Sequence, residues 1–202
     1  MADIEKLLGE GSKFLSEGEY PKAVKKFKEA VAEDPDLAVG YFYSAEALRL
    51  DQTMGNTRVK DKDILENYAK SVELDDANPE YMTSYGSFLM ESEAPDFDKA
   101  EDTYKKAFEL AAEDAEFSQM LASEYMFNIR TNADRALTRK QANQYIIRGL
   151  GYLFAAMGLE KERATGLLLL ERASEPEWVL GIALRALQIK KERAIEILNG
   201  MD

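Results

Sequence analysis

Apolar residues between positions 4 and 36 recur every three or four residues, with charged residues between them. Ala23, Phe27 and Ala30 follow this spacing, which places them on one face of a helix. Pro35 ends that helix because proline cannot continue the backbone hydrogen bonding. The same alternation of periodic apolar runs and polar turns continues along the chain. It predicts an all-α protein.

Residues 4–36 also carry small and aromatic side chains at defined positions. These are Gly11, Phe14, Gly18, Tyr20, Ala23, Phe27, Ala30 and Pro35. The set resembles the signature of the tetratricopeptide repeat, a pair of helices about 34 residues long. The spacing also has a physical reading, since Gly11 lets a neighbouring helix approach closely and Phe14 fills the gap between the two helices. Leu7 stands where the family often has Trp, and Glu10 departs from the usual Leu.

Two further copies follow the first. The second reads Tyr41, Ala45, Leu48, Ile64, Tyr68 and Ser71, and it ends at Asn78-Pro79. Its helices are separated by residues 51–63, about seven residues more than the family turn, which predicts a protruding loop. The third copy reads Met82, Tyr85, Gly86, Leu89, Phe97, Ala100, Tyr104 and Ala107. Residues 1–112 are therefore expected to hold three well-matched repeats.

Residues 113–202 match the repeat more weakly. The tetrapeptide Lys161-Glu-Arg-Ala164 recurs as Lys191-Glu-Arg-Ala194, and Trp178 precedes Ala194 at the spacing of the family's Trp. We expect degenerate repeats and a carboxyl-terminal cap here, continuous with the first part. The resemblance implies tandem antiparallel helix pairs stacked as a right-handed α-solenoid, with roughly eleven or twelve helices and no β-strand.

The chain contains no cysteine and no histidine. These absences exclude disulfides, thiolate nucleophiles, the commonest general base and the usual zinc ligands. Asp51, Asp61 and Asp63 could offer oxygen ligands, but their spacing does not match a calcium-binding loop. No metal, no cofactor and no catalytic residue is therefore expected.

The net charge is −12, and it is unevenly distributed, with −14 on residues 1–117 and +2 on residues 118–202. An acidic protein repels phosphate groups, so nucleic acid and anionic membranes are not expected partners. The amino terminus lacks the basic start and apolar stretch of a signal peptide. A cytoplasmic location is expected.

In the tetratricopeptide family the first helix of each pair lines a concave groove that binds peptides or proteins. That face maps here onto Glu5, Ser12, Phe42, Glu46, Arg49, Glu80, Thr83, Ser87 and Met90. Capture of an acidic chaperone tail is disfavoured because Arg49 is the one basic residue among them. We expect instead a basic or mixed basic-apolar segment, attracted by the glutamates and Glu91 and anchored near Phe42 and Met90. The alternative is that these acids only solvate the surface.

The corresponding face of the carboxyl-terminal part is nearly uncharged, which favours self-association or a hydrophobic partner. The candidate residues are Leu153, Met157, Val179, Leu187, Ile195 and Leu198. The alternative is that the chain's own helices bury this strip.

Together these patterns predict a non-catalytic scaffold or adaptor that binds a protein or peptide in its groove. A self-assembling, homo-oligomeric repeat protein and a helical enzyme working without Cys or His are the alternatives. Solution mass separates the first two, and a bound metabolite would support the third.

Overall fold

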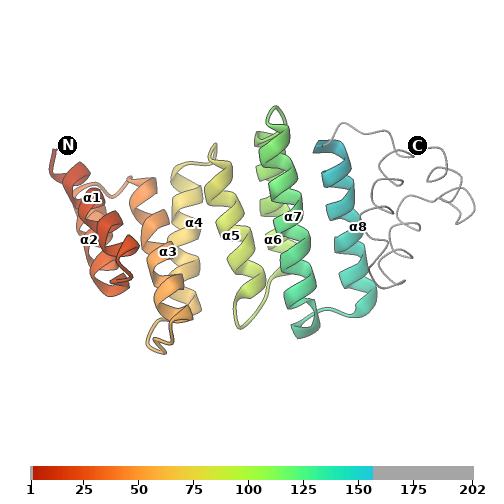
Figure 1. The fold of residues 1–202 in the computed structure, drawn as a ribbon, viewed down its shortest axis with the longest axis horizontal. Helices are drawn as coiled ribbons and strands as arrows, with labels where there is room; N and C mark the ends of the chain where they lie inside the picture. Colours follow the sequence, from red (N-terminus) through yellow and green to blue (C-terminus); the bar gives the residue numbers. More distant parts are fainter. Residues whose placement is uncertain (1, 157–202) are drawn as a thin grey trace, which may run out of the picture. The chain divides into compact units, whose positions relative to one another are not determined.

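The computed structural model of the protein describes residues 2–156, which form α-helices and no β-strand (Figure 1). The helices are α1 (Ala2–Ser16), α2 (Tyr20–Glu33), α3 (Ala38–Thr53), α4 (Asp61–Leu74), α5 (Pro79–Glu91), α6 (Phe97–Leu110), α7 (Ala115–Asn132), the 3-10 helix η1 (Ala133–Arg135) and α8 (Arg139–Ala156). This confirms the all-α prediction for the described residues.

The helices belong to two compact units. Unit 1 comprises residues 1–110 and contains α1 to α6, and unit 2 begins at Ala111 and contains α7, η1 and α8 in its described part. Within unit 1 each helix packs on the next one in the sequence, and within unit 2 α7 packs on α8. The pairs α1–α2, α3–α4 and α5–α6 correspond to the three predicted repeats. The further helices expected after α8 lie outside the described residues.

Local sequence explains where helix α5 begins and how the chain turns from α1 to α2. Pro79 opens α5, and the side chain of the preceding Asn78 accepts hydrogen bonds from the backbone N–H groups of Glu80 and Tyr81. Proline suits the first turn because its missing N–H would have no partner there in any case. Gly18 connects α1 to α2 with a φ of +75°, a conformation that glycine adopts without steric cost.

The first and third helix pairs close in the same way. A Cβ added to Gly11 of α1 would lie 2.5 Å from Cε1 of Phe27 on α2, and one added to Gly86 of α5 would lie 2.8 Å from Cδ2 of Tyr104 on α6. Both aromatic side chains are fully buried. The absence of a side chain at each glycine therefore lets the ring of the paired helix pack directly against the backbone.

Aromatic rings also link α3, α4 and α5. Phe42 stacks on Tyr81 with ring centroids 4.5 Å apart, and Tyr68 lies 6.0 Å from Phe88 and 6.4 Å from Tyr85. Aromatic pairs at these distances are favourable beyond the area that they bury. The tyrosines at repeat positions therefore form a packed interior.

The connection between α3 and α4 is shorter than the predicted loop of residues 51–63. Because α3 continues to Thr53 and α4 begins at Asp61, only residues 54–60 lie between the two helices. Side-chain amides tie the loop to the helix ends, since Asn56 Nδ2 donates to Asp51 and Gln52 Nε2 donates to Asp61 at 2.7 and 2.6 Å. Within residues 2–156, there is no group of three or more carboxylates placed so that it could hold a metal ion.

None of the helices that the structure describes is both long enough and apolar enough to cross a membrane.

Candidate protein-binding face

One face of unit 1 is formed by the first helix of each pair, namely α1, α3 and α5, and we refer to it as the first-helix face. Helices α1 and α3 contact one another, and a side-chain ion pair joins α3 to α5. The nine residues predicted for the groove all belong to these three helices, namely Glu5, Ser12, Phe42, Glu46, Arg49, Glu80, Thr83, Ser87 and Met90.

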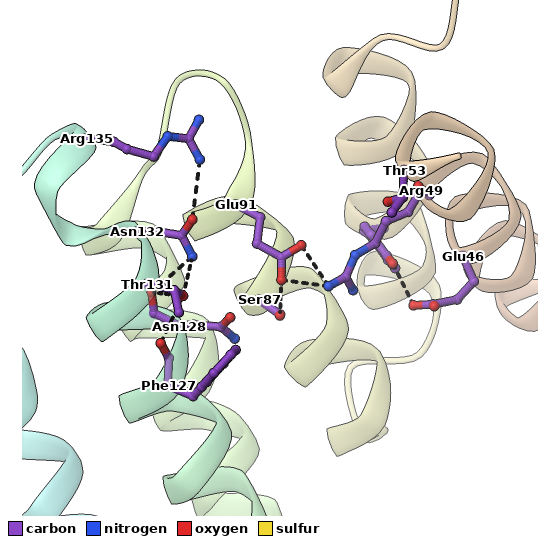
Figure 2. Close-up of polar contacts among 11 residues, drawn as sticks. Glu46, Arg49, Thr53, Ser87, Glu91, Phe127, Asn128, Thr131, Asn132 and Arg135 are labelled. Atoms are coloured by element: carbon purple, nitrogen blue, oxygen red, sulfur yellow. Dashed lines mark hydrogen bonds and ion pairs between the residues drawn. The ribbon is translucent and has the colours of Figure 1, made fainter. Parts of the chain in front are cut away.

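The ion pair between Arg49 and Glu91 lies on this face. Arg49 Nη2 donates to both carboxylate oxygens of Glu91 at 2.7 Å, and Ser87 Oγ donates to the same carboxylate at 3.1 Å (Figure 2). The side chains of Arg49 and Glu91 are only 25% and 31% exposed. A partly buried, charge-assisted contact of this kind is stronger than a surface ion pair.

A second hydrogen bond joins α3 to α4 beside this pair. The hydroxyl of the buried Tyr68 donates to Glu46 Oε1 at 2.6 Å. Burial and the Glu46 carboxylate raise the pKa of Tyr68 well above its usual value. Burial opposes the positive charge of Arg49, but Tyr68 and Glu91 outweigh it and raise the pKa of Arg49. The guanidinium also lies 5.9 Å over the ring of Phe88.

Glu46 and Glu91 are thus held by contacts within unit 1. The predicted attraction of a basic segment assumed that their charges face a partner. Among the predicted acids, Glu5 and Glu80 differ from them, because both are exposed and neither forms an ion pair within the described residues. They lie in the first turns of α1 and α5. Ser12 is exposed on α1.

Phe42 and Met90 were expected to anchor a partner, but both are buried inside unit 1 and offer little surface to one. Phe42 is 4% exposed because its ring packs against Tyr81 and Tyr43, and Met90 is fully buried. Thr83 and Ser87 are buried as well. Helical periodicity placed these residues on the first-helix face, but it does not distinguish the exposed part of a face from the part that packs on neighbouring helices.

Sequence reasoning missed the polar role of Tyr68, which it treated as a packing residue. No local spacing links Tyr68 to Glu46, 22 residues away, or Arg49 to Glu91, 42 residues away. The available signal was the opposite charge of Arg49 and Glu91 on the first helices of successive repeats. Its use required knowing that the two helices lie side by side.

The predicted self-association residues fall at the end of the described region or beyond it. Leu153 belongs to α8. Met157, Val179, Leu187, Ile195 and Leu198 lie outside the described residues. Self-association through this strip stays a prediction.

Unit 2 has a polar contact chain of its own at the end of α7. Asn132 Nδ2 donates to the backbone oxygen of Asn128 at 3.0 Å, and Arg135 Nη1 donates to Asn132 Oδ1 at 3.3 Å (Figure 2). These bonds satisfy a carbonyl near the helix end and hold the turn into η1.

The raised pKa of Tyr68 predicts how stability depends on pH. In the unfolded chain the phenol loses its proton near its ordinary pKa of 10.0, whereas in the folded protein it keeps the proton to higher pH. The folded state then binds more protons, so the free energy of unfolding falls as pH rises above about 10. Unfolding by urea between pH 8 and 11 measures this slope.

Tyr81, Lys26 and Lys70 also have raised pKa values and add to the same downward slope. The Tyr68→Phe variant measures the contribution of the Tyr68 hydroxyl to this slope, because it keeps the ring and removes the ionisable proton. We expect a shallower slope for this variant than for the wild type. Equal slopes would contradict the assigned role of the Tyr68 hydroxyl.

No protein-family model and no curated protein sequence matches this chain. Solved structures do match it. The crystal structure of MamA protein has a TM-score of 0.55 and 16% sequence identity, and the match covers 98% of this chain and 94% of that one. A second crystal structure of MamA has a TM-score of 0.51 and 17% identity, with 94% of each chain covered. The TPR domain of P58(IPK) is 24% identical over 97% of this chain and 54% of its own, with a TM-score of 0.47.

At these identities the likeness to MamA concerns the fold. It agrees with the packing of successive helices within each unit. The chain has a tetratricopeptide-like fold of helical repeats.

Proposed function

We propose that the protein is a non-catalytic scaffold that binds a basic or mixed basic-apolar protein segment on the first-helix face of unit 1. The fold supports binding in general, because stacked helix pairs present extended surfaces built from successive repeats. The observation that carries the proposal is the contrast among the acids of this face. Glu46 and Glu91 are held by Tyr68 and Arg49, while Glu5 and Glu80 are exposed and without an ion-pair partner among the described residues.

The two sets of acidic residues therefore have different roles. The contacts of Glu46 and Glu91 tie α3 to α4 and α5 and so stiffen the face. Glu5 and Glu80 are available to attract cationic side chains, and exposed charges of this kind affect the association rate and the choice of partner. Their other role is to favour the start of a helix, since an acidic side chain in the first turn interacts well with the helix dipole.

Affinity capture from a native extract tests the proposal. The full chain and the variant Glu5→Lys/Glu80→Lys would be immobilised separately, and the retained proteins would be identified by mass spectrometry. We expect at least one partner with a basic segment to be retained by the wild type and to be about tenfold depleted on the variant.

A matched control carries the same change in charge on second helices. Glu33 of α2 and Asp102 of α6 are exposed, and neither forms an ion pair within the described residues. The variant Glu33→Lys/Asp102→Lys is expected to retain the partner. Equal loss on both variants would mean that net charge alone attracts the partner, and retention by both would place binding away from Glu5 and Glu80.

A further inference from the structure

The opposite side of unit 1 contains a hollow between the second helices α4 and α6. Two adjoining cavities of about 670 and 440 Å³ lie there. Both are lined by Ala69 of α4, Tyr85 of α5 and Lys99 of α6, so they form one elongated depression, which we call the α4–α6 trough. The trough extends from Asp61, at the start of α4, to Asp76, just beyond its end.

The floor of the trough is apolar. Leu65, Ala69 and Val72 follow one another at spacings of four and three on α4, which aligns them on one side of the helix. All three are only half-buried. Met82 and Tyr85 of α5 also line the floor, as does Leu110 of α6, which is 44% exposed.

The two walls carry opposite charges. Lys62, Glu66, Glu73 and Asp76 line the α4 side, which is acidic on balance, whereas Lys99, Lys106 and Glu109 line the α6 side, which is basic on balance. Glu93, before the start of α6, also lines the trough. Lys62 and Lys70 balance Glu66 and Glu73 within α4, but no ion pair within the described residues involves Asp76 or Lys106. The Nζ atom of Lys99 lies 5.2 Å over the ring of Tyr85, which holds the ammonium at the edge of the apolar floor.

We propose that the α4–α6 trough binds an amphipathic helix of a partner protein. The apolar side of this helix lies on the floor, its basic flank runs along α4, and its acidic flank runs along Lys99 and Lys106. Helix α4 has 14 residues, which at about 1.5 Å per residue corresponds to a bound helix of roughly four turns. Helix-in-groove recognition uses this combination of apolar anchors and flanking charges.

This surface is separate from the first-helix face, because its walls come from the second helices of the pairs. The unequal walls also determine the direction of the bound helix. Turning the helix end for end would bring its acidic flank to α4 and its basic flank to the lysines, and like charges across an interface disfavour such an arrangement.

Three synthetic peptides of sixteen residues provide the probes. Each has leucine and alanine at the spacing of one helical face, and they differ in the flanks: one peptide has lysine on one flank and glutamate on the other, one has lysine on both, and one has glutamate on both. Fluorescence anisotropy with the full chain at physiological salt gives the three dissociation constants. For the wild type we expect the mixed peptide to bind more tightly than either uniform peptide.

The variant Lys99→Glu/Lys106→Glu makes both walls acidic. It should shift the ratio of the dissociation constants of the mixed and all-lysine peptides by about tenfold or more in favour of the all-lysine peptide. The control Lys25→Glu/Lys28→Glu makes the same change in net charge on exposed residues of α2 and should leave the ratio unchanged.

Three outcomes would overturn the proposal: absence of binding by all three peptides at millimolar concentration, preference of the wild type for the all-lysine peptide, or an equal shift in the α2 control. The variant Glu5→Lys/Glu80→Lys should bind the mixed peptide as the wild type does. This variant therefore distinguishes a failure of the trough proposal from a failure of the proposed binding on the first-helix face.

Discussion

Replacing Phe27 with alanine is expected to lower the free energy of unfolding by about 3–5 kcal/mol, the range for phenylalanine truncation in a packed core. The side chain of Phe27 is fully buried, its ring stacks on Tyr43 at 5.4 Å, and Gly11 packs against its edge. Glycine has no side chain that could move into the space left by the ring. Because Gly11 cannot fill this space, we expect the cavity to close only in part, which makes the substitution costly.

Phe127→Ala serves as the matched control, because the same side chain is removed from a position that is 63% exposed. Its effect should stay within about 0.5 kcal/mol. Guanidinium unfolding followed by circular dichroism at 222 nm gives both values, and the midpoint should shift without a change in slope. Losses for Phe27→Ala and Phe127→Ala that agree within about 1 kcal/mol would contradict the core role of Phe27.

The ion pair between Arg49 and Glu91 should show a large coupling energy in a double-mutant cycle. Arg49→Met removes the charge and keeps an apolar stem over Phe88, and it leaves the carboxylate of Glu91 partly desolvated. We expect a loss of about 1–3 kcal/mol, below the range for a fully buried pair because about a quarter of the Arg49 side chain remains exposed. Glu91→Gln should cost much less in the Arg49→Met background than in the wild type.

The pair Lys25–Glu29 on α2 is the control for this cycle. Its closest nitrogen–oxygen distance is 3.9 Å and its side chains are 76% and 39% exposed, so solvent screens it and its coupling should be near zero. High salt should weaken the control pair further and change the Arg49–Glu91 coupling little. If the two cycles give the same coupling energy, the Arg49–Glu91 contact does not stabilise the face.

Much of the fold of unit 1 follows from short-range sequence patterns. Ala23, Phe27 and Ala30 were predicted to share the buried side of one helix, and all three are fully buried. The close approach predicted at Gly11 is present. These predictions succeed because helical periodicity and the steric effect of a missing side chain act over a few residues.

The loop prediction was less accurate. Residues 51–53 and 61–63 lie in helices, although they were predicted to belong to the loop because this segment is longer than the family turn. Hydrogen bonds from Gln52 and Asn56 to Asp61 and Asp51 hold the helix ends together, and side-chain contacts of this kind are not visible in a count of residues between the two helices of a repeat.

By itself the sequence determined the helices, the pairing that begins with Gly11 and Phe27, the acidic character of unit 1 and the absence of Cys and His chemistry. Only the tertiary structure decided that Phe42 is buried, that Tyr68 holds Glu46, that Arg49 holds Glu91, and that α4 and α6 enclose a trough with oppositely charged walls. The physical reason is the range of the interactions. Periodicity and backbone sterics act within one helix, whereas burial and charge pairing depend on side chains that approach one another only after separate helices have packed.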